Sequence, residues 1–171
     1  RYFNLRQKPK EIFVLKQLLK LYEDESSSDQ LDVAITARRI GWLYSYQGLS
    51  DKAEPYLLLA LKILDDRGFE DELTADVLYN LSESYQMRVG TPSEIQSKEI
   101  NDSLYKQSKL FALRALTITE KVFGPQSLYL VRILDQLSML GESKENLEYI
   151  KRAYEINRNF KGDEDYSTTR I

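Results

Sequence analysis

Apolar and small residues recur at intervals of three and four along most of the chain, the period of a helix with one buried face. The pattern is clearest over residues 37–63, where the turn sequence Gly48-Leu49-Ser50-Asp51 separates two such runs. Small residues at Gly41, Ala53 and Ala60 fall on the facing sides of the two runs. We therefore predict a helical hairpin whose two helices pack closely.

The same period continues through the rest of the chain and predicts an all-α fold of about seven helices. The expected helices cover about residues 8–25, 30–47, 50 into the charged stretch 65–68, 73–89, 104–122, 128–140 and 143–159. Gly48 is expected to end the second helix. Ser50 and Ser143 are expected to cap the third and seventh helices, and Pro55 to fall in or near the first turn of the third.

The hairpin recurs along the chain, which is typical of a solenoid. The frame Ala37-x-x-Ile40-Gly41-x-x-Tyr44 returns at 78–85 and more weakly at 130–137, and Ala53-x-x-x-Leu57-x-x-Ala60 returns at 108–115 and 146–153. The first helix fits the second half of an earlier, degenerate repeat. We predict one domain made of a half repeat at 8–25, repeats at 30–67, 73–122 and 127–159, and a tail at 160–171.

The middle hairpin is longer than its neighbours. Tyr85 and Ser108 lie 23 positions apart, whereas the equivalent Tyr44 and Ala53 lie 9 apart. The additional residues fall in the polar stretch 91–103, which we predict to form a projecting loop. Its capping-box sequence Thr91-Pro92-Ser93-Glu94 predicts a short helical turn there. A loop with a function and a tolerated surface insertion both remain open.

Composition narrows the classes of function. The chain has 171 residues, 30% of them charged, and a net charge of −3. It therefore has no overall positive charge that would attract nucleic acid. It has no Cys and no His, which removes disulfides, thiol nucleophiles and the commonest general base and metal ligand. No apolar run approaches the roughly 20 residues of a membrane span. Because it begins at Arg1, we expect a piece of a longer protein.

The repeat resembles the tetratricopeptide repeat, whose pattern is W-x2-L-G-x2-Y followed by A-x3-F. Its longer period resembles the kinesin-light-chain type, on the residues at 44–48, 53–55 and 115–125. The sequence departs from that type at Gln126-Ser127, where His-Pro is common, and at Asn146, where Ala is usual. The resemblance implies a right-handed superhelical solenoid with a concave groove.

The resemblance also implies that the first helix of each hairpin lines the groove and binds a peptide or partner segment. Helical spacing then selects the candidates that lie off the packing face. The partner-binding candidates are Arg38, Trp42, Tyr46, Tyr79, Asn80, Glu83, Arg132 and Asp135. Ser45, Met87 and Met139 lie on the same faces. Trp42 has two open interpretations, an aromatic anchor for a partner side chain or core packing between repeats.

Several alternatives stay open beside this adaptor. Arg38, Asn80 and Arg132 occupy three of the five positions of the carboxylate clamp found in some tetratricopeptide domains, but Trp42 and Leu128 stand at the other two. A scaffold or assembly subunit could instead dock through its convex face or the 91–103 insertion. We expect a protein or peptide partner with some acidic character. The hypothesis includes no enzyme activity, catalytic residue, metal or cofactor, and no contact with nucleic acid or membrane.

The compartment follows from the resemblance alone. Proteins with this repeat type include cytoplasmic transport adaptors and the soluble parts of organelle-anchored proteins, mitochondrial ones among them. The resemblance therefore implies an intracellular location.

Overall fold

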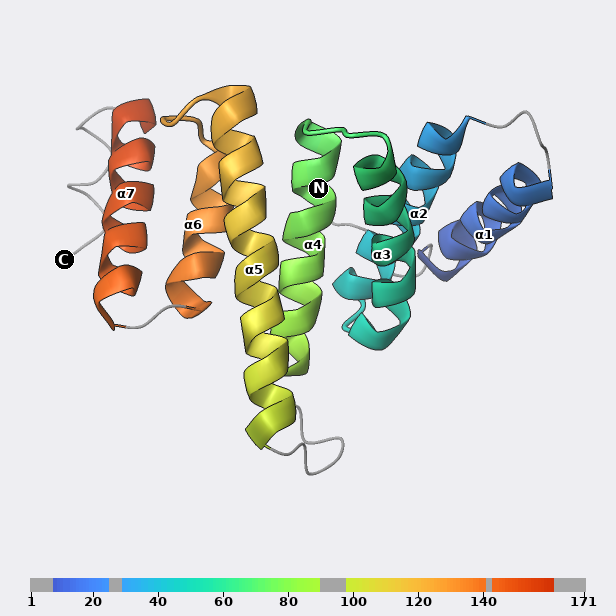
Figure 1. The fold of residues 1–171 in the computed structure, drawn as a ribbon, viewed down its shortest axis with the longest axis horizontal. Coiled ribbons are helices and arrows are strands. Elements are labelled where there is room, and N and C mark those ends of the chain that lie inside the picture. Colours follow the sequence, from blue (N-terminus) through green and yellow to red (C-terminus); the bar gives the residue numbers. More distant parts are fainter. Residues whose placement is uncertain (1–7, 25–28, 90–97, 141–142, 162–171) are drawn as a thin grey trace.

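A computed structural model describes residues 8–24, 29–89, 98–140 and 143–161. Those residues form seven α-helices and no strand, which confirms the all-α prediction. The helices are α1 (Lys8–Asp24), α2 (Gln30–Tyr46), α3 (Ser50–Asp66), α4 (Glu72–Arg88), α5 (Lys98–Phe123), α6 (Tyr129–Leu140) and α7 (Ser143–Lys161). They stand side by side in a row with α1 at one end and α7 at the other (Figure 1).

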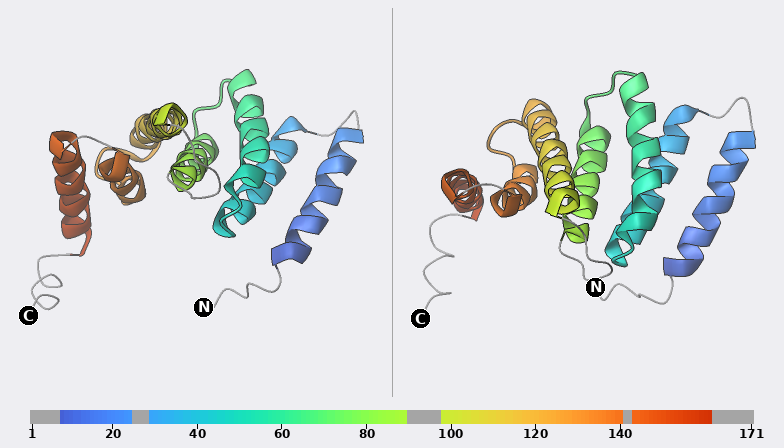
Figure 2. Two further views of the ribbon diagram at one scale, coloured as in Figure 1. Left: turned by 90° about the horizontal axis from the view of Figure 1, so that it is seen from below. Right: turned by 60° about the horizontal axis from the view of Figure 1, so that its bottom comes forward.

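The helices pack as three hairpins, α2 with α3, α4 with α5 and α6 with α7, and each hairpin packs on the next. Helix α1 packs on α2, and α2 also contacts α4 across the junction between their hairpins. The two turned views in Figure 2 show the same succession of helices from α1 to α7. This arrangement is a helical solenoid, because each hairpin buries its apolar face only against its neighbours.

The turns and caps explain where most helices begin and end. Gly48 has a φ of +73°, a conformation that L side chains rarely adopt, and it ends α2 as the sequence predicts. Asp29 and Asp71 cap α2 and α4, and their carboxylates accept from the backbone N–H of Leu31 and Thr74, each at 3.0 Å.

The capping prediction for Ser50 is wrong. Leu49 takes the cap position of α3 without a side-chain hydrogen bond, and Ser50 is the first helical residue. Ser50 is buried against α4, where its carbonyl accepts from the hydroxyl of Ser84 at 3.3 Å. Helix α7 likewise begins at Ser143, one residue earlier than a cap at that position predicts.

Helix α5 begins at Lys98, whereas the sequence pattern predicted a start near Leu104. Residues 98–103, expected in a projecting loop, continue the helix instead. No Gly or Pro interrupts residues 98–123, so no helix breaker separates residues 98–103 from the buried Leu104. The predicted turn at Thr91–Glu94 lies outside the described residues.

One continuous core runs through the hairpins. It takes the fully buried Leu57, Leu78, Leu81 and Leu137 from three helices and includes the small alanines of the repeat frame. A smaller cluster joins α1 to α2, and another joins α6 to α7. Since the repeat frame supplies these buried positions, the spacing noticed in the sequence is the spacing of the core.

Candidate partner-binding surface

The eight candidate residues do not form one site. One group lies around Asp76 and consists of Arg38, Tyr79 and Arg132. A second group lines a hollow between α2 and α4 and consists of Trp42, Tyr46 and Glu83. Asp135 lines another hollow at the end of the solenoid. Asn80 is only 5% exposed, so the prediction that it is accessible in a groove is wrong.

Asp76 on α4 joins three successive hairpins. Its carboxylate lies 3.5 Å from the guanidinium of Arg38 on α2, and it also pairs with Arg132 on α6. The Arg132 guanidinium lies 4.7 Å from the ring centroid of Tyr79, a cation–π contact. Burial, followed by the nearby carboxylate of Glu83, raises the pKa of Tyr79.

This arrangement bears on the carboxylate clamp. Both arginines of the partial clamp already share the carboxylate of Asp76, and the third member, Asn80, is buried. A bound carboxylate needs several converging donors to offset its loss of hydration. These residues therefore do not form a ready site for an acidic chain end.

The first hollow, here called the α2–α4 hollow, lies where the C-terminal parts of α2 and α4 meet and has a volume of about 470 Å³. It is lined by Trp42, Ser45, Tyr46, Gln47, Gly48, Glu83 and Met87. Tyr46 and Met87 are 51% and 45% exposed. The hollow therefore presents an aromatic and a flexible apolar side chain to solvent beside polar groups.

Trp42 is positioned both for core packing and beside the α2–α4 hollow. Its half-buried indole packs against the α1–α2 core cluster and also lines the α2–α4 hollow. The rings of Trp42 and Tyr46 lie 5.7 Å apart between centroids. Cations contact both: the Lys8 ammonium is 2.9 Å from the Tyr46 centroid, and the Arg39 guanidinium is 4.8 Å from that of Trp42.

Glu83 is the acidic group of this hollow. Burial raises the pKa of its carboxyl group, and the positive charge of Arg132 opposes that effect. Arg132 forms its own ion pair with Asp76 rather than with Glu83. Within the described ranges, no hydrogen bond or ion pair is formed by the Glu83 side chain.

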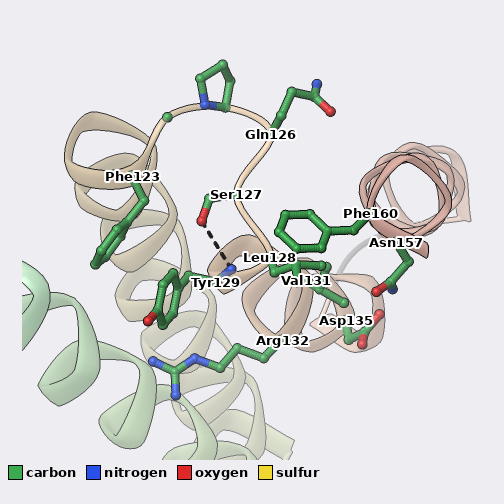
Figure 3. A pocket seen from close by; sticks show the side chains of 12 residues that line it. Phe123, Gln126, Ser127, Leu128, Tyr129, Val131, Arg132, Asp135, Asn157 and Phe160 are labelled. Atoms are coloured by element: carbon green, nitrogen blue, oxygen red, sulfur yellow. Dashed lines mark hydrogen bonds between the residues drawn. The ribbon is translucent and has the colours of Figure 1, made fainter. Parts of the chain in front are cut away.

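The second hollow, here called the end hollow, lies between the α5–α6 turn, the first half of α6 and the end of α7, with a volume of about 930 Å³. Figure 3 shows Phe160 of α7 beside Leu128 and Val131, with Asp135 and Asn157 below them. The rings of Phe123 and Tyr129 stack at 4.4 Å on its other side.

Sequence reasoning missed Asp76, Gln47 and most of the end hollow. Asp76 precedes Tyr79 by three and Glu83 by seven positions, so helical spacing alone would have placed it on the face already selected. The end hollow had no such signal, because its residues come from a turn and two helices. Among the described residues, no cluster of three or more metal-ligating side chains is found, and no helix is long and apolar enough to span a bilayer.

Comparison with known proteins finds a likeness to solved structures but not to a family model. No family model and no curated protein sequence matches the chain. The crystal structure of BtubC (BKLC) from P. vanneervenii is similar, with a TM-score of 0.74 over 90% of this chain and 19% sequence identity. The matched part is 57% of the BtubC chain, so this chain spans little more than half of that protein. The likeness supports a tetratricopeptide-like helical repeat fold.

Proposed function

We propose that the chain is a non-catalytic adaptor module that binds a segment of a partner protein along the surface formed by α2, α4 and α6. The observation that carries this proposal is the α2–α4 hollow, where Trp42, Tyr46 and Glu83 meet although they come from two hairpins. A tetratricopeptide-like fold supports a protein-interaction role in general. In this proposal the partner segment docks at the hollow.

The side chains of the hollow suit protein recognition. Aromatic residues bury a large area on binding and have few torsions to immobilise, which makes them frequent anchors of interfaces. Met87 adds a flexible thioether that adapts to differently shaped partners. The polar groups beside them provide orientation, since a few well-placed donors and acceptors fix the pose of a ligand in a largely apolar site.

A photo-crosslinking experiment tests the adaptor function. A benzoylphenylalanine residue replaces Tyr46 in one variant and the exposed Lys62 of α3 in a control. After irradiation in cell extract, we expect a distinct protein product from position 46 that is absent from position 62. The identity of that product, read by mass spectrometry, gives the partner, and no product at position 46 contradicts the proposal.

A scaffold function is the second candidate, because the last hairpin exposes apolar side chains outside the α2–α4–α6 surface. Ile150 and Tyr154 on α7 are 51% and 46% exposed. Their equivalents in the repeat frame, Leu57 and Leu61 on α3, are 0% and 7% exposed and belong to the main core cluster. Phe160 on the same helix as Ile150 lines the end hollow and is 66% exposed.

The same crosslinking experiment separates the two functions. A third variant carries the benzoylphenylalanine at Ile150. If products form at position 150 and not at position 46, docking through the last hairpin is favoured and the adaptor proposal fails. Products at position 46 alone favour the adaptor.

A further inference from the structure

The α2–α4 hollow contains two polar side chains without partners. Ser45 is 3% exposed and lines the hollow, and its Oγ has no hydrogen-bond partner among the described residues. Gln47 follows two positions later, at the C-terminal cap of α2, and its Nε2 is also buried without an acceptor. A buried polar group left unpaired costs about 1–3 kcal/mol, so such groups are rare and call for an explanation.

The carboxylate of Glu83 shares this hollow. It forms no ion pair with any described residue. Arg132 is the cation whose charge acts on Glu83, and its guanidinium is paired with Asp76. The hollow thus holds one carboxylate acceptor in Glu83, one amide donor in Gln47 and one hydroxyl in Ser45 that both donates and accepts. These groups are complementary to a ligand that brings several donors and at least one acceptor.

We infer that the α2–α4 hollow binds a lysine or arginine side chain of the partner segment, with its cationic group at Glu83 and Ser45 and a partner carbonyl at Gln47. This inference rests on the proposed adaptor function and specifies its ligand. A charge-assisted hydrogen bond to the Glu83 carboxylate is the strongest contact available there. The carbonyl that Gln47 requires is present in any extended peptide backbone.

The aromatic wall of the hollow already packs against two cations of the chain. Lys8 places its ammonium over the ring of Tyr46, and Arg39 places its guanidinium over Trp42. The Arg39 guanidinium is itself paired with Oε1 of Glu11 at 2.6 Å. Lys8 and Arg39 are not among the residues that line the hollow. The aromatic pair therefore tolerates positive charge close to its rings.

An acidic ligand does not fit this hollow. The carboxylate of Glu83 would repel it, and the arginines that could attract it, Arg38 and Arg132, are paired with Asp76. The expectation of an acidic partner, drawn from those two arginines in the sequence, is therefore replaced here by a basic one.

Trp42 makes the inference directly measurable, because it is the only tryptophan of the chain and it lines the hollow. The probes are acetylated, amidated pentapeptides of four alanines with a central Arg, Lys, Met or Glu. Titration of Trp42 fluorescence is expected to give a saturable change with the Arg and Lys peptides. The Met and Glu peptides are expected to bind at least about tenfold more weakly, the loss of about 1.4 kcal/mol that one charge-assisted bond accounts for.

The decisive variant is Glu83→Gln, which keeps the shape of the side chain and removes its charge. We expect it to weaken the Arg and Lys peptides at least about tenfold and to leave the Met peptide unchanged. Glu148→Gln, on the exposed face of α7, is the matched control and is expected to bind like the parent. Circular dichroism shows whether each variant is folded.

Three results overturn the inference: no saturable change with either basic peptide, equal binding of the Met or Glu peptide, or parent-like binding by Glu83→Gln. Failure of the inference is distinguishable from failure of the adaptor function. If the crosslinked partner at position 46 persists in the Glu83→Gln background, the adaptor stands and only the basic ligand is wrong. If no partner crosslinks at position 46, the adaptor function itself fails.

Discussion

A Cβ atom on Gly41 would lie 2.5 Å from the Cγ of Leu57, closer than any real Cβ contact. Gly41 is on α2 and Leu57 is on α3, so this contact sets how closely the two helices of the hairpin approach. The carbonyl of Ala53, one turn earlier on α3, would be 3.3 Å from the same Cβ. The close packing predicted from the small residues of the repeat frame is therefore present.

We predict that Gly41→Ala destabilises the protein. The added methyl forces the fully buried Leu57 to move, which typically costs about 1–3 kcal/mol. Alanine recovers at most about 1 kcal/mol through its higher helix propensity. Urea unfolding followed by circular dichroism measures the difference. In the double variant Gly41→Ala with Leu57→Ala, the methyl has room, so its cost should largely vanish. An unchanged or higher midpoint for the single variant contradicts the prediction.

In the next hairpin, Ser82 stands at the position equivalent to Gly41 and forms buried hydrogen bonds with Ser108. The hydroxyl of Ser108 on α5 donates to the carbonyl of Ser82 on α4 at 2.7 Å, and the two hydroxyl oxygens are 3.1 Å apart. We expect Ser108→Ala to cost about 1–3 kcal/mol, because it removes the buried hydrogen bond to the Ser82 carbonyl and leaves the Ser82 hydroxyl with only its 3.4 Å contact to Gln136. The exposed Ser103→Ala on the same helix is the control and should change stability little. Equal midpoints for the two variants would refute this account.

Local features of the sequence made most of the fold predictable. The turn at Gly48 has the positive φ that its sequence indicated, and the small positions Gly41, Ala53 and Ala60 are buried. Helix ends were harder to place where no glycine or proline marks them. The start of α5 at Lys98 is the main case, since the polar residues before Leu104 carry no apolar period although they extend the helix.

The candidate site was less predictable, because its contacts join residues far apart in the chain. Arg38 and Arg132 lie 38 and 56 positions from Asp76, and a sequence pattern within one helix contains no information on that pairing. The burial of Asn80 has the same origin, since it depends on how neighbouring hairpins are placed. The residues selected from the sequence include some from both helices that line the hollow, but the sequence could not show which side chains meet there.

We predict a modest and salt-dependent effect for Asp76→Asn. The two ion pairs are about one-quarter to one-half exposed, and such pairs are worth about 0.2–1 kcal/mol each. Their loss also leaves the guanidinium groups of Arg38 and Arg132 without the carboxylate between them. We expect a loss of about 1 kcal/mol at low salt that shrinks as salt screens the charges.

The control for Asp76→Asn is Asp66→Asn, which removes only the exposed pair with Lys62. Its effect should stay within about 0.5 kcal/mol at any salt concentration. Thermal melts at several salt concentrations measure both variants. A loss for Asp76→Asn that does not depend on salt would point to packing instead of charge.

We predict that Ala60→Asp unfolds the domain. Ala60 is fully buried in the main core cluster, and the new carboxylate would have no cationic partner among the apolar residues around it. Burial of an unpaired charge belongs to the few changes that cost more than about 4 kcal/mol. A circular-dichroism melt like that of the parent would disprove this. Lys62→Asp, two positions later on the exposed side of α3, should remain folded.

Glu83 provides a prediction on pH, because burial raises the pKa of its carboxyl group above the ordinary value of 4.5. A carboxyl group with a raised folded-state pKa binds its proton more tightly in the folded than in the unfolded chain. Its ionised form therefore destabilises the fold at neutral pH. That penalty declines as the pH falls through the raised pKa and is gone once the pH lies below 4.5.

Glu83→Gln removes the ionisable group, so the variant should melt at a higher temperature than the parent at neutral pH. The difference should disappear below the ordinary glutamate pKa, where the parent carboxyl group is also neutral. Melts of both proteins across this pH range measure the effect, with Glu148→Gln as the exposed control that shows no such trend.

A variant that is less stable than the parent at neutral pH would show that Glu83 already has a stabilising partner within the protein. In that case the carboxylate is not available to a basic ligand, and the stability measurement would count against the binding role inferred for the hollow. If the variant is more stable, Glu83 is a residue that lowers stability in the free protein, as expected of a group whose partner arrives on binding.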